Sequence, residues 1–164
     1  MYASFMDAVE LLTGHHREME AQFKALKDAE HVDQKLFDEL ADALAAHITV
    51  EEEIFYPAVK ANRTEEILLE SLEEHLSLKR VLADLVELRA DAEKFVPKLH
   101  VLAEQAEHHH EEEEEHLFPK VKKSLSSDEL AALGRQMQAR MAELEALSVR
   151  KAMPGQTGDS ATLA

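Results

Sequence analysis

The sequence predicts an all-α protein, an antiparallel up-down four-helix bundle with an additional C-terminal helix. Composition is the first reason, because 4 Gly and 4 Pro among 164 residues leave few helix breakers. Ala and Leu are abundant, whereas Ile and Thr, which favour strands, are scarce. Periodicity is the second reason. Apolar residues recur at alternating spacings of four and three, the pattern of a helix with one buried face.

Capping residues divide the chain into five predicted helices. Ser4, Asp33 and Thr64 each precede a helical pattern and can cap the first three helices. Ser126, with Glu129 three residues later, forms a capping box for the last helix. The predicted helices cover about residues 5–30, 34–61, 65–90, 94–122 and 127–151.

The same signals divide the chain into three parts. Residues 1–125 contain the predicted bundle, and residues 126–152 form an appended amphipathic helix. This helix is either a lid on the bundle or a dimer seam, so we expect a monomer or a homodimer. Residues 153–164 contain Pro154 and two glycines and are expected to be a disordered tail. The apolar stripe of the appended helix consists of Leu130, Leu133, Met137, Met141, Leu144 and Leu147.

Charge and cysteine content exclude several classes of protein. Asp and Glu outnumber Lys and Arg by 34 to 18, a net charge of −16 that repels nucleic acid and anionic lipid. The absence of cysteine excludes thiolate catalysis, iron–sulfur clusters and zinc fingers, and fits a reducing compartment. No apolar run approaches the roughly 20 residues of a membrane helix. We expect a cytoplasmic protein without nucleic-acid or membrane partners.

Histidines interrupt all four apolar stripes of the predicted bundle, and two stripes add a glutamate one turn later. Buried histidine and glutamate are costly without partners, and a single such histidine would be interpreted as a hydrogen-bonded core residue. Four helices that each direct a histidine inward favour a metal centre instead, because a cation binds neutral imidazole and stabilises carboxylate. The predicted metal ligands are His16, His47, Glu51, His75, His109 and Glu113.

The two His-x-x-x-Glu segments belong to an internal repeat. His47 and His109 each stand ten residues before a proline, and each is followed by three consecutive glutamates. The spacing of four places histidine and glutamate on one helical face. The repeat therefore predicts a pseudo-two-fold bundle with the site on its axis.

The pattern H…HxxxE…H…HxxxE resembles the hemerythrin-like family, also called the HHE cation-binding domain. The flanks Glu-Glu-Glu-x-Phe-Tyr-Pro and Glu-Glu-Glu-x-Leu-Phe-Pro resemble the same family, and the resemblance covers about residues 5–123. It implies a non-heme di-iron centre with an oxo or hydroxo bridge, held by the six predicted ligands. The donor types by themselves suit manganese or zinc as well as iron.

The sequence departs from the oxygen-carrying hemerythrins at one position. Those proteins have two histidines one turn apart on the third helix, whereas Lys79 follows His75 here. If both glutamates bridge and an oxo or hydroxo group joins the metals, two coordination positions remain open. We expect Lys79 to have a lowered pKa, to reach away from the metals or to pair with a glutamate.

The remaining histidines are expected outside the ligand set. His15, His108 and His110 each neighbour a predicted ligand and lie about 100° off its stripe, so they should stand outside or around the site. His116 lies on the stripe and is expected at a partly solvated helix end. Two further histidines have no periodic support and are expected on the surface, His31 and His100.

The open centre predicts a di-iron protein that reacts with hydrogen peroxide or dioxygen, with catalase-like peroxide decomposition as its specific activity. The alternative is a non-catalytic module that binds or senses iron or oxygen. A third hypothesis is a purely structural bundle whose histidines are hydrogen-bonded. The sequence assigns no catalytic residue.

Overall fold

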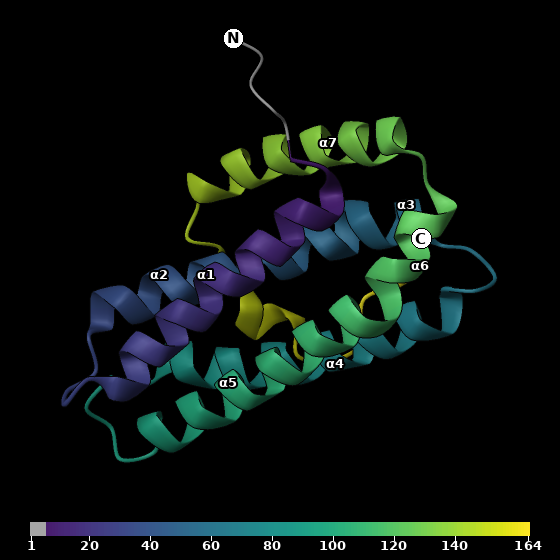
Figure 1. Cartoon of the computed structure of the whole chain (residues 1–164). Helices are drawn as coiled ribbons and strands as arrows, with labels where there is room; N and C mark the ends of the chain where they lie inside the picture. The colour runs from purple at the N-terminus through teal and green to yellow at the C-terminus, as the bar shows by residue number, and fades with distance from the viewer. Residues whose placement is uncertain (1–5) are drawn as a thin grey trace, which may run out of the picture.

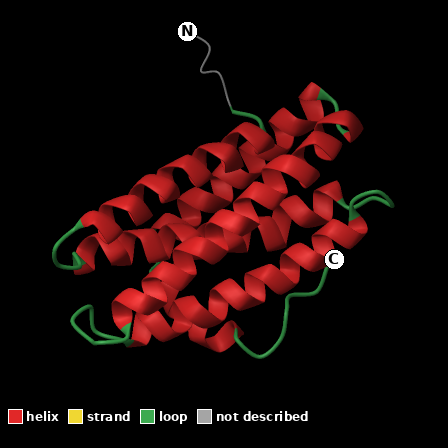
Figure 2. Cartoon of the chain, turned by 60° about the horizontal axis from the view of Figure 1, so that its bottom comes forward, coloured by secondary structure: helices red, strands yellow, loops and turns green. Residues whose placement is uncertain are grey.

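Four long helices form the body of the protein in the computed structural model, which describes residues 6–164 (Figure 1). They are α1 (Ala8–Asp28), α2 (Gln34–Val50), α4 (Glu65–Glu87) and α5 (Phe95–Glu112). Helix α1 contacts α2 and α5, and α4 contacts the same two neighbours, so the contacts close a ring around one core. Residues 6–164 contain helices and no strand, which confirms the all-α class (Figure 2). The antiparallel up-down topology stays a prediction.

Short polar residues cap some of the helices where the sequence predicts. Thr64 does not cap α4 as predicted, because its hydroxyl donates to the carbonyl oxygen of Val59 instead. Asp7 caps α1 by accepting a hydrogen bond from the backbone N–H of Glu10 at 2.9 Å, and the Glu10 carboxylate accepts one from the N–H of Asp7. Asp33 caps α2 at the predicted position. Ser4, the predicted cap of the first helix, and Phe5, its first stripe residue, lie outside the described residues.

A widened turn interrupts each of the two helices that carry a His-x-x-x-Glu segment. The chain continues from α2 through a π-helical turn, η1 (Glu51–Phe55), into α3 (Tyr56–Val59), and from α5 through η2 (Glu113–Leu117) into α6 (Phe118–Ser124). Pro57 and Pro119 stand at the start of α3 and α6. Proline has no N–H, and its ring crowds the carbonyl four residues earlier, which favours the wider turn. The sequence predicts an uninterrupted helix in both places, and this prediction is wrong.

The extra residue in each π turn shifts the buried face by one position. The predicted stripe continues through Ile54 and Ala58, but Ile54 is half-buried and Ala58 exposed, whereas Phe55 is fully buried. In the second repeat His116 is 56% exposed, as expected for a solvated helix end, and its neighbour Leu117 is buried. The stripes keep their predicted register only up to the two glutamates.

Apart from Val86 near the end of α4, which is partly buried, the apolar members of the stripes before these turns are buried in one continuous core. They are Val9, Leu12, Met19, Phe23, Leu26, Phe37, Leu40, Leu44, Leu68, Leu72, Leu82, Phe95, Leu99, Leu102 and Ala106. No helix within residues 6–164 is both long and apolar enough to cross a membrane.

The appended helix α7 (Ser127–Glu145) packs on α1 and α2 of its own chain (Figure 1). The predicted capping box at Ser126 is present. Leu130 and Met137 are buried, whereas Leu147, the last residue of the predicted stripe, is 60% exposed. Gly134 faces the start of α1 so closely that a Cβ there would lie 2.4 Å from the carbonyl oxygen of Met6.

The C-terminal segment packs against the bundle, which differs from the disordered tail that the sequence predicts from residue 153. A 3-10 helix, η3 (Val149–Gln156), contacts α2 and α4. Met153 is fully buried, and the Arg150 guanidinium donates to Asp42 Oδ2 at 2.7 Å. The physical reason is that two apolar side chains, Val149 and Met153, are covered by packing on the bundle.

The two glycines inside long helices should respond with opposite signs to alanine. Gly14→Ala should raise the free energy of unfolding by about 0.5–1 kcal/mol, because a Cβ there meets nothing within 4 Å. Gly134→Ala should lower it by about 1–3 kcal/mol, because the Cβ overlaps backbone atoms of residues 6 and 7. Urea denaturation measures both changes. Stabilisation by Gly134→Ala would contradict the close approach of α7 to α1.

Candidate metal centre

The six predicted ligand residues meet inside the bundle, and all six side chains are buried. Helices α1, α2, α4 and α5 each supply one histidine, and the first residue of each π turn is a glutamate. Nε2 of His47 and Nε2 of His75 each lie 3.2 Å from Oε1 of Glu51. Nε2 of His16 lies 3.3 Å, and that of His109 3.5 Å, from Oε1 of Glu113. The structure thus brings all six residues together.

The donor atoms form two groups that share Glu51. One group consists of His16, His47, Glu51 and Glu113, and the other of Glu51, His75 and His109; within each, the ligand atoms lie within 4.8 Å of one another. Because Glu113 also approaches His109, each glutamate borders histidines of both groups. This arrangement places the two carboxylates between two neighbouring groups of imidazoles.

Two of the predicted ligand histidines are oriented by the second glutamate of a Glu-Glu-Glu triplet, the residue that follows the inward-facing glutamate. Nδ1 of His75 lies 2.9 Å from Oε2 of Glu52, and Nδ1 of His16 lies 3.0 Å from Oε2 of Glu114. A carboxylate at Nδ1 fixes the ring orientation and the tautomer, which leaves Nε2 free to bind a metal. The second glutamate of each triplet therefore has a role that α-helical periodicity does not indicate.

The other two histidines are oriented by residues that precede a ligand on a neighbouring helix. Nδ1 of His109 lies 2.9 Å from Oε1 of Glu74, the residue before His75. Nδ1 of His47 lies 3.4 Å from Nδ1 of His15, the residue before His16. The internal repeat thus extends to the groups around the ligands.

Several inward-facing atoms have no hydrogen-bond partner in the described chain. These atoms are Nε2 of His16 and His47, Oε2 of Glu51 and Oε1 of Glu113. An unpartnered buried polar atom costs free energy because it has lost water without gaining a replacement. A cation would supply that replacement to imidazole and carboxylate together. The residues therefore fit a metal centre.

Electrostatics divide the four histidines into two pairs and separate the two carboxyl groups. Burial lowers the pKa of His16 and of His47. Burial acts in the same direction on His75 and His109, but the carboxylates beside them hold the pKa of both above its ordinary value. Burial and the charge of Glu51 raise the pKa of Glu113 well above its ordinary value. Burial also acts to raise the pKa of Glu51, but His47 and further hydrogen bonds hold it well below. Two carboxylates in one buried space repel each other, which moves their two pKa values apart. A cation between them would reduce this repulsion.

Tyr56 is a site residue that periodicity does not find. Its hydroxyl donates to Oε2 of Glu113 at 3.0 Å and lies 3.2 Å from Nε2 of His75. An α-helix would direct residue 56 away from the face of Glu51, but the π turn closes with the Tyr56 N–H on the Glu51 carbonyl. Burial, with Glu113, raises the pKa of Tyr56 well above its ordinary value. In the sequence, Tyr56-Pro57 stands out only as the match of Phe118-Pro119 in the internal repeat.

Lys79 is buried beside the centre and pairs with a glutamate, one of the three outcomes expected for it. Its Nζ lies 2.7 Å from Oε1 of Glu52, the carboxylate that also holds Nδ1 of His75. Lys79 therefore neutralises an orienting carboxylate and belongs to neither group of donor atoms.

His110 departs most from expectation among the histidines beside the ligands. It is buried, and its ring stacks on His16 with centroids 3.9 Å apart and an interplanar angle of 11°. Burial, with His16 and His47 nearby, lowers its pKa well below the ordinary value. The residue is off the predicted stripe, but α1 packs against α5 and so widens the buried face.

The remaining histidines lie close to where the sequence places them. His108 is 66% exposed, and His31 and His100 are exposed. His15 is half-buried against His47, and burial followed by His47 lowers its pKa to about 4.

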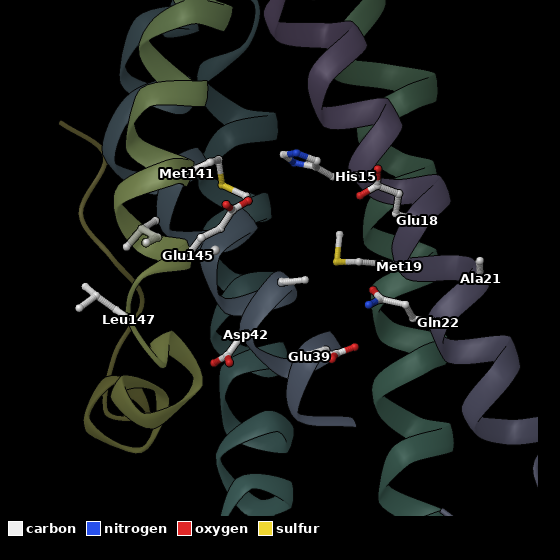
Figure 3. Close-up of a pocket in the computed structure, with 13 residues that line it drawn as sticks. His15, Glu18, Met19, Ala21, Gln22, Glu39, Asp42, Met141, Glu145 and Leu147 are labelled. Carbon is white, nitrogen blue, oxygen red and sulfur yellow. The ribbon is translucent and has the colours of Figure 1, made fainter. Parts of the chain in front are cut away.

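A cavity of about 620 Å³ opens between α1, α2 and α7 and has His15 in its wall (Figure 3). Met19 and Met141 are among its apolar lining residues, and Glu145 is one of several carboxylates around it. Because His15 also contacts His47, one imidazole ring separates this cavity from a predicted metal ligand.

Comparison with known proteins gives a family match and a similar fold. The family model for the hemerythrin HHE cation-binding domain matches residues 7–121. The structure is similar to the crystal structure of a hemerythrin HHE cation-binding domain-containing protein from Mycobacterium kansasii, with a TM-score of 0.75 and 24% sequence identity. The similarity covers 93% of this chain and 94% of that chain. No curated protein sequence matches the chain.

Replacement of an orienting carboxylate should weaken metal binding without removing a ligand. Glu74→Gln should lower the affinity for Fe²⁺ or Zn²⁺ by about 10–100-fold, because His109 loses the carboxylate at Nδ1. Glu70→Gln on the same helix is the control, since Glu70 is exposed and should leave the affinity unchanged. Competition with a chelator measures both. Equal affinities in the two variants would contradict the role of Glu74.

Proposed function

Because the chain belongs to the hemerythrin HHE cation-binding family, we propose that it binds two iron ions per chain and decomposes hydrogen peroxide into dioxygen and water. The observation that carries this proposal is the pair of donor groups that share Glu51. The proposed ligands are His16, His47, Glu51, His75, His109 and Glu113.

The choice of iron over manganese rests on the resemblance to the hemerythrin-like family, which implies a di-iron centre, and the reaction excludes zinc. Imidazole and carboxylate without thiolate suit iron, manganese and zinc. Zinc has no redox chemistry, whereas peroxide decomposition moves two electrons. Two iron ions would supply that reversible electron exchange.

The donor count leaves room for a small molecule on the side of His75 and His109. Their group contains one glutamate and two histidines, and Lys79, one turn beyond His75, is held by Glu52 instead. The hydroxyl of Tyr56 lies on this side, 3.2 Å from Nε2 of His75 and 3.4 Å from Nε2 of His109. We place the peroxide-binding site there.

The reaction is a disproportionation of two peroxide molecules. One molecule loses two electrons and two protons and leaves as dioxygen, and the second takes them up and leaves as two water molecules. Tyr56 stays protonated because burial, with Glu113, raises its pKa, and it donates its single proton to Glu113, so its hydroxyl oxygen can accept a hydrogen bond from the O–H of peroxide. The Glu113 oxygen that accepts from Tyr56 holds this hydroxyl in place. Buried leucines, among them Leu12 and Leu44, keep bulk water out of the core.

The protein loaded with ferrous iron should release dioxygen from hydrogen peroxide well above the rate of the same concentration of free iron. An oxygen electrode measures the rate, and metal analysis should find about two irons per chain. His47→Ala and Glu113→Ala should each lose at least half of the iron and most of the activity, because each removes a donor of the shared site. His100→Ala, an exposed position on α5, should change neither.

The results separate this proposal from its alternatives. Two bound irons without dioxygen release above free iron would overturn the enzymatic function and support a module that binds or senses iron or oxygen. A protein that binds no metal and keeps its stability in the His47→Ala variant would support the purely structural bundle.

A further inference from the structure

His110 is a buried histidine whose Nε2 atom makes no hydrogen bond within the described residues. Its side chain is 2% exposed, and Nε2 has no hydrogen-bond partner in the described chain. A neutral ring in that state loses the hydrogen bond that water would make. The burial of His110 therefore costs free energy that an apolar side chain would not cost.

The internal repeat shows that the bundle does not need a polar residue at this position. His110 follows His109 as Ile48 follows His47, and Ile48 is also buried, at 1% exposure. An apolar side chain thus occupies the equivalent place in the other half of the fold. At this position, only the second half of the repeat has a polar side chain.

The ring of His110 lies against two of the proposed ligands. It stacks on His16, and its centroid lies 5.5 Å from that of His47. One ring nitrogen from each of these three histidines lies within 4.8 Å of the other two. Two nitrogens that bind one cation lie at most about 4.2 Å apart, so a rotation of the stacked rings would bring the three nitrogens onto one cation.

We infer that His110 is a further nitrogen ligand, which binds the cation held by His16 and His47. The inference rests on the proposed two-cation centre and makes its two positions unequal. One position has three imidazoles, whereas the other has His75, His109 and the nearby hydroxyl of Tyr56. The third imidazole closes the first position, so a small ligand exchanges at the second.

Histidine nitrogen NMR on the parent protein loaded with Zn²⁺ tests this assignment without any substitution. Metal-bound Nε2 atoms differ in chemical shift from free imidazole nitrogens, and Zn²⁺ is diamagnetic. We expect five rings with a metal-bound nitrogen, His110 among them. A His110 ring with the shifts of a free neutral imidazole, beside four metal-bound rings, would overturn the inference and leave the proposed centre intact.

Replacement of His110 by the residue of the repeat tests its energetic contribution. His110→Ile should speed the loss of one of the two Zn²⁺ ions to a chelator by at least about tenfold and leave the other rate unchanged. Circular dichroism should show the same helix content as in the parent, since Ile48 shows that the fold accepts isoleucine at this position. His100→Ala is the control and should release both ions at the parent rates.

The outcomes distinguish this inference from the proposed function. Parent rates for both ions in His110→Ile would overturn the role of His110 alone. A parent protein that binds no Zn²⁺ would overturn the two-cation centre together with this inference.

Discussion

Two carboxylates, Glu51 and Glu113, are buried in a largely apolar bundle, and their burial determines how the groups around them are arranged. Uncompensated charge in such a core is heavily penalised, so every neighbouring group must help to balance it. The balance is built in layers. Imidazole nitrogens surround the two carboxylates. A second set of carboxylates holds Nδ1 of three of the four histidines, and lysine and arginine side chains pair with two of these carboxylates. Lys79 pairs with Glu52, and Arg17 pairs with Glu114. The unpartnered atoms that remain at the centre are those that a metal would bind.

The repeat arranges this centre, and the differences between its halves give the two sides different chemistry. Tyr56 and Phe118 occupy equivalent places after the π turns. Tyr56 stacks on His75, and Phe118 stacks on His16, but only the tyrosine of this pair can donate a hydrogen bond to the centre. His110 and Ile48 form a second unequal pair. A hydroxyl thus marks one side and an extra imidazole the other, in a fold whose backbone treats both sides alike.

The helices and the six inward-facing residues could be predicted from the sequence because both follow from regular periodicity. Spacings of three and four place His47 above Glu51, and the structure keeps that register. The prediction fails where regularity ends. The π turn after Glu51 moves Tyr56 onto the inner face, and no α-helical pattern contains that shift. The burial of His110 depends on how closely α1 approaches α5, and that of Met153 on a groove formed by other helices; both are tertiary properties.

We propose that two cations lie on either side of Glu51. Anomalous diffraction from crystals of the iron-loaded protein, recorded at the iron absorption edge, locates bound iron. We expect two anomalous peaks per chain, one next to His16 and His47 and the other next to His75 and His109. A single peak bound by all six residues, or no peak inside the bundle, would contradict it.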